Sequence, residues 1–200
     1  MANRNGMGTR VEVLELALNG VPAKPPCRLC GDMEPAPTQD GAYTWVPSGV
    51  TWAKAALTNK RNVFSVHGIG AAGVSFILRR YPLTLNSAIR WQGQHCFITS
   101  ILPADYGHLT VEAALVVLSQ CRNPYTGETF PAVMTERYVG YQQLEPMAVN
   151  IHQRVLVTPK AVRLDPGPLV EVDGVAWPIA TPYELDPHKN EYVLQRTVDL

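Results

Sequence analysis

Two stretches of the chain, Leu83–Ile98 (LTLNSAIRWQGQHCFI) and Leu164–Ile179 (LDPGPLVEVDGVAWPI), follow one pattern. Each starts at a turn, continues as a short apolar segment, turns at a glycine (Gly93 or Gly174) and returns as a second apolar segment with an aromatic residue. A glycine-containing turn between two short apolar segments is typical of a β-hairpin. We call the sequence separation of Gly93 from Gly174 the repeat offset, and the same offset relates the starts and the ends of the two stretches. This constant offset predicts an internal duplication, with the same hairpin in each half of the chain.

The segments around the two hairpins also predict short strands. Glycine and proline together make up about one residue in six of the 200, which excludes a helical bundle or a coiled coil. Arg10–Leu18 (RVEVLELAL) alternates apolar and polar residues with one slip between Val13 and Leu14. We expect a strand with a β-bulge at this slip, with a short helix as the alternative. Leu109–Leu118 fits either a helix or a strand, and its valines favour a strand.

These patterns predict a mainly β protein with two small β-barrel-like domains related by the duplication. The first domain comprises residues 1–121 and includes a long loop at 19–41, and the second comprises residues 122–200. Each domain is small for an isolated core, so we expect the two to support each other or to assemble. The expected core is Val11, Leu14, Trp52, Ile77, Ile89, Phe97, Ile98, Val170, Trp177 and Ile179.

The composition excludes several classes of protein. Hydrophobic residues make up 46% of the chain, which is enough for a core and argues against disorder throughout. No apolar run reaches the roughly 18 residues of a membrane-spanning helix, and the polar N-terminus lacks the apolar segment of a signal peptide. Four cysteines are too few for a disulfide scaffold, so we expect reduced thiols.

A net charge of zero conceals an asymmetry between the two halves of the chain. Residues 1–100 carry a net charge of +5 and residues 101–200 a net charge of −5, and no acidic residue lies between Asp40 and Asp105. Such a chain suits a position between two different partners. The alternative is that the two halves neutralise each other in the fold.

The acid-free stretch supplies the candidate interface residues. Tryptophans are interleaved with its basic residues, as on a binding surface, and the candidates are Lys54, Lys60, Arg61, Arg79, Arg80, Arg90, Trp52 and Trp91. The neutral total charge and the absence of a nucleic-acid-binding motif argue against tight, sequence-specific DNA binding. An acidic protein partner, or weak contact with DNA passing through a channel, fits better.

The motifs that carry chemistry are weak in this sequence. Cys27-Arg-Leu-Cys30 has the spacing of half a zinc site, but no second half follows, so a redox pair or two thiols without a role stay open. The glycines of Gly68–Gly73 match a dinucleotide-binding pattern by count, but a strand rather than a helix is expected after them. Ser100, His95 and Asp105 could be drawn as a triad, yet no nucleophile motif surrounds the serine. We therefore expect neither an enzyme nor a cofactor.

The first half resembles the phage head–tail adaptor, or head-closure, family over about residues 10–120. The likeness is carried, in chain order, by an early strand, a loop ending in Asp-Gly, a Trp-Ala pair, a strand ending in Arg-Tyr, an Ile-Arg pair, a glycine turn, an aromatic-Ile pair and a closing apolar strand: Val11–Leu18, Asp40-Gly41, Trp52-Ala53, Arg80-Tyr81, Ile89-Arg90, Gly93, Phe97-Ile98 and Leu109–Leu118. Proteins of this family sit between the portal ring of a tailed-phage capsid and the tail.

The resemblance implies a structural protein of the virion neck, assembled in the host cytoplasm, that seals the capsid channel and offers the tail a docking surface. It implies a ring of identical subunits with a portal or adaptor protein on one side and a tail or tail-terminator protein on the other. It also implies transient contact with the genomic DNA and no contact with a membrane. A tail-completion, terminator or baseplate adaptor protein is the alternative within the same assembly, and a small zinc-binding interaction module is the alternative of another class.

Overall fold

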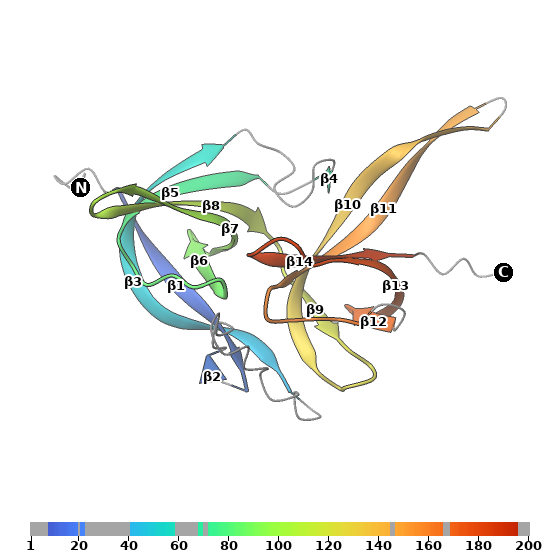
Figure 1. The fold of residues 1–200 in the computed structure, drawn as a ribbon, viewed down its shortest axis with the longest axis horizontal. Coiled ribbons are helices and arrows are strands. Elements are labelled where there is room, and N and C mark those ends of the chain that lie inside the picture. Colours follow the sequence, from blue (N-terminus) through green and yellow to red (C-terminus); the bar gives the residue numbers. More distant parts are fainter. Residues whose placement is uncertain are drawn as a thin grey trace.

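Two closed six-stranded antiparallel barrels lie side by side along the long axis of the molecule (Figure 1). The computed structural model describes residues 8–19, 21–22, 41–58, 68–69, 72–144, 147–165 and 169–195, and these residues form strands, turns and loops without a helix. The predicted fold class, mainly β with two small barrels, is therefore confirmed. Within the described ranges, no helix is long and apolar enough to cross a membrane.

The first barrel is formed by the N-terminal half of the chain. Around the barrel, the strands follow the order β1 (Thr9–Leu18), β3 (Tyr43–Thr58), β5 (Gly73–Arg79), β8 (His108–Val116), β7 (Gln94–Asp105) and β6 (Ser87–Trp91). Pairing of β6 with β1 closes the barrel. A two-residue strand, β2 (Val21–Pro22), pairs with the end of β1.

The second barrel is formed by the C-terminal half. Its order is β9 (Ser119–Arg122), β10 (Thr129–Leu144), β11 (Met147–Pro159), β14 (Lys189–Leu194), β13 (Val175–Tyr183) and β12 (Leu169–Val172), and β12 pairs with β9. A short strand from the first half, β4 (Gly68–Ile69), pairs with β10. The chain passes from one barrel to the other between Val116 and Ser119, so the predicted boundary at residues 121 and 122 lies inside β9.

The two barrels share one topology and, over their last three strands, one register. The hairpin β6–β7 pairs Ala88 with Phe97, and the hairpin β12–β13 pairs Leu169 with Pro178, each residue displaced by the repeat offset. The central residues of both turns have positive φ, as the tight turns of two-residue hairpins require: Gln92, Gly93, Asp173 and Gly174. A β-bulge follows at Ile98/Ser100 in β7 and at Ile179/Thr181 in β13, again at the repeat offset. The hairpins therefore occupy equivalent places, as the duplication predicts.

An ion pair occurs at the same place in both barrels with its charges exchanged. In the first barrel Arg90 of β6 contacts Glu12 of β1 at 2.8 Å, and in the second Glu171 of β12 contacts Arg122 of β9 at 3.9 Å. Arg90 and Glu171 are related by the repeat offset, and they pair with Glu12 and Arg122 across the strands that close each barrel. Both barrels thus carry an oppositely charged pair at this place, with the positive and the negative residue exchanged.

The core follows the sequence expectations in most places. β1 is a strand with its register shift between Val13 and Leu14, as predicted, which excludes the helical alternative. The core prediction is wrong for two residues, because Trp52 is 49% exposed and Ile77 is 38% exposed. Both point outward from strands whose inward positions are filled by Ala53, Phe76 and Leu78. Trp177 is half-buried, and the other predicted core residues are buried.

An apolar contact joins the two barrels. Phe97 and Ala114 on the outer side of the first barrel form one buried cluster with Val133, Val155 and Val157 on the outer side of the second. Val116 and Leu118, in and after β8, pack against the same cluster. A second contact brings Leu16 and Tyr43 from the first barrel into the core cluster of the second. The barrels therefore bury apolar surface against each other, as expected for domains of this size.

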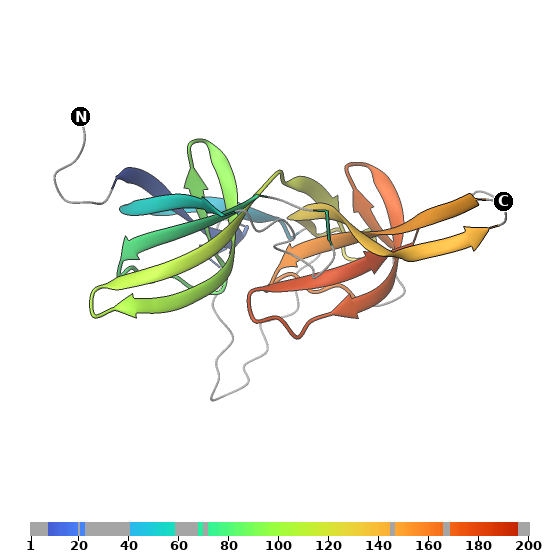
Figure 2. The ribbon, with the colours of Figure 1, turned by 90° about the horizontal axis from the view of Figure 1, so that it is seen from above.

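The hairpin β10–β11 extends beyond the second barrel as a two-stranded arm, visible in both views (Figures 1 and 2). Its register runs from Val133↔Val157 out to Leu144↔Met147. The neighbouring strand β14 accompanies β11 only from Arg154 to Pro159. A two-stranded ribbon is at best marginally stable alone in water, so an arm of this kind is suited to contact with another surface.

Candidate functional site

The outer side of the first barrel gathers basic and apolar residues into one exposed surface. The strand register places Lys54 of β3 opposite Ile77 of β5 and places Trp52 opposite Arg10 of β1. Arg79 is two residues from Ile77 and therefore on the same side of β5. All five are exposed. We call this surface, made of Arg10, Trp52, Lys54, Ile77 and Arg79, the basic face.

The cations of the basic face have no acidic partner within the described residues, where four ion pairs are found. Three acidic residues lie near the basic face in the register: Glu12, two residues from Arg10 and paired with Arg90, Glu112, opposite Ser75, and Asp105, next to the cross-strand partner of Arg79, His108. Asp105 accepts a hydrogen bond from the Gly107 amide at 2.9 Å and contacts Nδ1 of His108 at 2.8 Å. The Gly107 amide, followed by His108, lowers the pKa of Asp105, so this carboxylate is already satisfied. None of the three cations of the basic face therefore has a carboxylate within 4.0 Å among the described residues.

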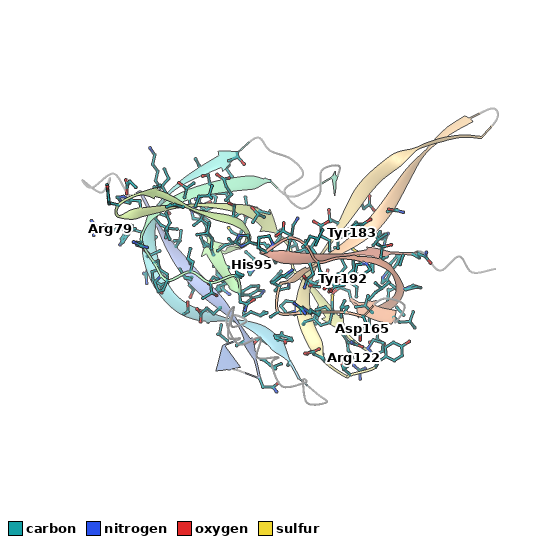
Figure 3. The ribbon with its side chains drawn as sticks, in the orientation of Figure 1. Arg79, His95, Arg122, Asp165, Tyr183 and Tyr192 are labelled. Carbon is teal, nitrogen blue, oxygen red and sulfur yellow. The ribbon has the colours of Figure 1, made fainter. Side chains whose placement is uncertain are left out.

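The structure brings only part of the predicted interface together. Trp52, Lys54 and Arg79 lie on the basic face, and Arg80, also exposed, follows directly after β5, where its amide donates to the carbonyl of Gly107 at 2.8 Å. Figure 3 places Arg79 at the end of the first barrel remote from the second. Two other predicted residues, Lys60 and Arg61, lie outside the described residues, as do Cys27 and Cys30.

Two other residues of the predicted interface make contacts within the first barrel. Arg90 is engaged by Glu12 across the closing strands. Trp91 is half-buried, packs against the first core and meets Phe76 edge-to-face, with ring centroids 5.9 Å apart. Sequence reasoning could not separate Trp91 from Trp52, because the outward or inward position of a residue depends on which strands close the barrel. Conversely, Arg10 and Ile77 joined the basic face without having been predicted as interface residues.

None of the four ion pairs found among the described residues joins the two barrels. Arg90–Glu12 and His108–Asp105 lie within the first barrel, and Arg122–Glu171 and Lys189–Glu191 lie within the second. The alternative that basic residues of the first half are neutralised by acidic residues of the second half therefore finds no support in this part of the chain.

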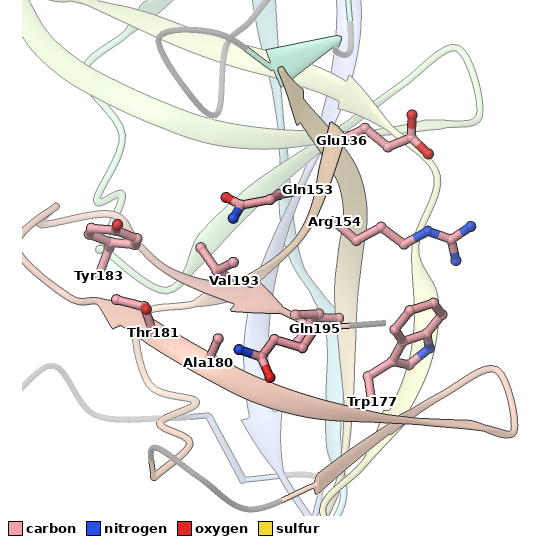
Figure 4. A pocket seen from close by; sticks show the side chains of 10 residues that line it. Glu136, Gln153, Arg154, Trp177, Ala180, Thr181, Tyr183, Val193 and Gln195 are labelled. Atoms are coloured by element: carbon pink, nitrogen blue, oxygen red, sulfur yellow. The ribbon is translucent and has the colours of Figure 1, made fainter. Parts of the chain in front are cut away.

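A surface pocket of about 640 Å³ lies where the arm leaves the second barrel (Figure 4). The guanidinium of Arg154 stacks over the ring of Trp177, 4.6 Å from its centroid. Glu136 lies directly opposite Arg154 in the β10–β11 register, yet the two do not form one of the four ion pairs found among the described residues. Tyr183 and Gln195 complete the wall toward β13 and β14. No motif predicted this pocket, since it forms from four strands that meet only in the closed barrel.

The histidine of the suggested triad lies near the junction of the barrels, away from its expected partners (Figure 3). His95 packs on Trp45, with ring centroids 5.1 Å apart, and its Nε2 is buried with no hydrogen-bond partner among the described residues. Burial, followed by the charge of Arg90, lowers the pKa of His95 to about 4. Asp105 is bound to His108 instead, so the structure does not assemble the triad.

No group of three or more potential metal ligands occurs among the described side chains. Comparisons with protein-family models, with curated proteins and with solved structures found no match. The surfaces themselves therefore carry the functional argument.

Proposed function

We propose that this protein is a structural component of the neck of a tailed phage, a head-closure or head–tail connector protein that acts by assembly. The observation that carries the proposal is the basic face: three cations without a carboxylate partner in the described structure surround an exposed tryptophan and an exposed isoleucine. Exposed apolar residues rimmed by charge are typical of a protein–protein contact. The resemblance of residues 10–120 to the head-closure family supplies the setting.

The chemistry of the basic face selects its partner. Positive charge that is not neutralised within the subunit steers an acidic surface toward it and disfavours basic ones. The exposed indole of Trp52 and the side chain of Ile77 then gain from being removed from water when the partner docks. A connector needs such orientation, because each of its ends has to join only one neighbour. The arm formed by β10 and β11 supports the same role, since it offers a second, separate contact element.

Charge reversal on the basic face tests the proposal. We expect Lys54→Glu combined with Arg79→Glu to lower the yield of tailed particles by at least about tenfold, which corresponds to a loss of about 1.4 kcal/mol in docking. Folding should be unaffected, because exposed charges add little stability. The control is Arg163→Glu, at an exposed arginine of the second barrel that takes part in none of the four ion pairs. The assay is complementation of a phage that lacks this chain, with filled heads, free tails and joined particles counted by electron microscopy.

Two results would oppose the proposal. A normally folded Lys54→Glu, Arg79→Glu variant with an unchanged yield of joined particles would remove the basic face from the assembly. Absence of the chain from the neck in purified particles, measured by mass spectrometry and by imaging of the neck, would refute the connector role as a whole.

A further inference from the structure

The contact between the two barrels is made by two different surfaces. The first barrel contributes outer positions of β7 and β8, with Phe97 and Ala114, and the second contributes outer positions of β10 and β11, with Val133, Val155 and Val157. Since the barrels share one topology, each of these surfaces has a counterpart on the other barrel. Contacts between unlike surfaces leave one of each free at the two ends, and they propagate to further copies.

The strand registers identify the free counterpart on the first barrel. Ile77 pairs with Thr110 and Val157 pairs with Glu191, and the repeat offset relates Thr110 to Glu191, so Ile77 is the counterpart of Val157. By the same reasoning through Glu112 and Val193, Ser75 is the counterpart of Val155. Lys54 pairs with Ile77 as Val133 pairs with Val157, which makes Lys54 the counterpart of Val133.

The free counterpart on the second barrel follows from the duplicated hairpin. Pro178 occupies the position of Phe97, displaced by the repeat offset. Gln195 occupies the position of Ala114: Ala114 pairs with Phe97, and the amide of Gln195 donates to the carbonyl of Pro178 at 3.0 Å. Gln195 is exposed and Pro178 is half-buried, whereas Phe97 and Ala114 are buried under the other barrel. Gln195 also borders the pocket shown in Figure 4.

We propose that a second copy of this chain docks head-to-tail, with Pro178 and Gln195 of one copy against Lys54, Ser75 and Ile77 of the next. The inference rests on the proposed function, since it names the partner of the basic face. The proposed contact between copies has the same packing as the contact that already joins the two barrels within one copy. Repetition of one unlike contact gives a closed ring if the rotation per subunit closes and a filament if it does not.

The residue differences between the buried β10–β11 surface and its free counterpart on the first barrel fit a contact between copies. In the buried contact within the chain, three valines face Phe97 and Ala114. At the free surface, Lys54 and Ser75 replace two of these valines and Ile77 keeps the apolar character, which lets the surface stay exposed before assembly. The charges also match, because residues 1–118, which contain the first barrel, carry a net charge of +3 and meet residues 119–200 of the next copy, which contain the second barrel and carry a net charge of −3. Opposite charge at the two ends favours this orientation over contact between like ends.

Cross-linking with two introduced cysteines tests the proposal. The counterparts of Ser75 and Gln195 are Val155 and Ala114, which lie in one buried cluster within the chain. In a Cys27→Ser, Cys30→Ser background, a chain with Ser75→Cys and Gln195→Cys should therefore give a ladder of covalent multimers with a short bifunctional thiol reagent. Either cysteine alone should give no ladder. The matched control keeps Ser75→Cys and replaces Gln195→Cys by Val175→Cys, an exposed position on the same barrel.

Sedimentation of the protein without introduced cysteines gives an independent readout. Placing a second positive charge opposite Lys54 in the contact, with Ile77→Lys, should weaken self-association by at least about tenfold, because two like charges would have to be buried side by side. Val175→Lys should leave self-association unchanged. The inference would be overturned if the double variant gave no more ladder than the Val175→Cys control. It would also be overturned if Ser75→Cys alone gave dimers in the same yield as the double variant, because such dimers would indicate contact between like surfaces.

The outcomes separate this inference from the proposed function. A chain found in the phage neck that gives no ladder keeps its connector role and loses the head-to-tail contact. A ladder from a chain that is absent from the neck keeps the contact and refutes the connector role.

Discussion

Lowering the pH from about 7 to about 5 should destabilise the wild-type protein more than a His95→Gln variant. His95 lies against Trp45 with its Nε2 buried, and it is held neutral in the folded protein, where burial and the nearby charge of Arg90 lower its pKa from 6.5 to about 4. In the unfolded chain the imidazole regains its ordinary pKa and binds a proton at a higher pH. The unfolded state therefore binds more protons between these two pKa values, and the free energy of unfolding falls as the pH decreases.

The size of the effect follows from the change in pKa. A fall from 6.5 to about 4 corresponds to about 3 kcal/mol between the neutral and the protonated side chain, at about 1.4 kcal/mol for each step of one in pKa. At about pH 5 the unfolded chain is largely protonated at this residue and the folded protein is not, so about 2 kcal/mol of the effect should be present. At about pH 7 both states are neutral and the contribution of His95 vanishes.

Urea denaturation of both proteins at about pH 7 and about pH 5 measures this difference. We expect the wild type to lose about 2 kcal/mol more than His95→Gln over this interval, since the comparison with the variant cancels the contribution of every other titrating group. Titration of the His95 ring by NMR in the wild type keeps the prediction testable even if the variant folds poorly. A titration midpoint near 6.5, or equal pH dependence in the two proteins, would show that His95 is not buried as described.

Two further predictions concern the packing around Gly49 in the first barrel and the buried thiols, one in each barrel. A Cβ atom on Gly49 would collide with the hydroxyl of Tyr81, which packs against the first core; Gly49→Ala should therefore cost about 1–3 kcal/mol, and adding Tyr81→Phe should recover part of the loss in thermal melting. Burial raises the pKa of Cys96 and of Cys121 to about 12, so in a Cys27→Ser, Cys30→Ser background neither thiol should react with a thiol reagent near pH 8 until the protein unfolds. Rapid labelling of the folded protein, followed by mass spectrometry, would contradict the burial of these residues.

The arrangement of the two hairpins could be predicted from local sequence. A turn that needs positive φ at its central residues favours glycine and its polar neighbours, and these occur in Gln92-Gly93 and Asp173-Gly174. The repeat offset between the turns survives in the structure as identical pairing and identical bulges. The bulge of β1 was also predictable, because alternation of apolar residues slips by one place where an extra residue enters a strand.

The sequence predicted the positive charge of the basic face, but not which residues form it. The absence of acidic residues between Asp40 and Asp105 marks the segment, and Lys54 and Arg79 do lie on one surface. The same segment also contains Trp91, which packs inward, while Trp52 was expected in the core and is exposed. Large apolar residues of a closed barrel divide between two sides, and the sequence of a single strand does not say which side faces the core.

The features that the sequence did not determine were decided by closure of the barrels, because closure depends on pairing between strands that are far apart in the chain. The sequence by itself determined the β-class, the two hairpins, their duplication and the polarity of charge, since turns, alternation and composition are local properties. Only the tertiary structure placed β1 beside β6 and β9 beside β12, and with them the exchanged ion pairs, the contact between the barrels and its two uncovered counterparts. Those surfaces arise from the register of neighbouring strands, which is fixed by the packing of both sides of a sheet at once.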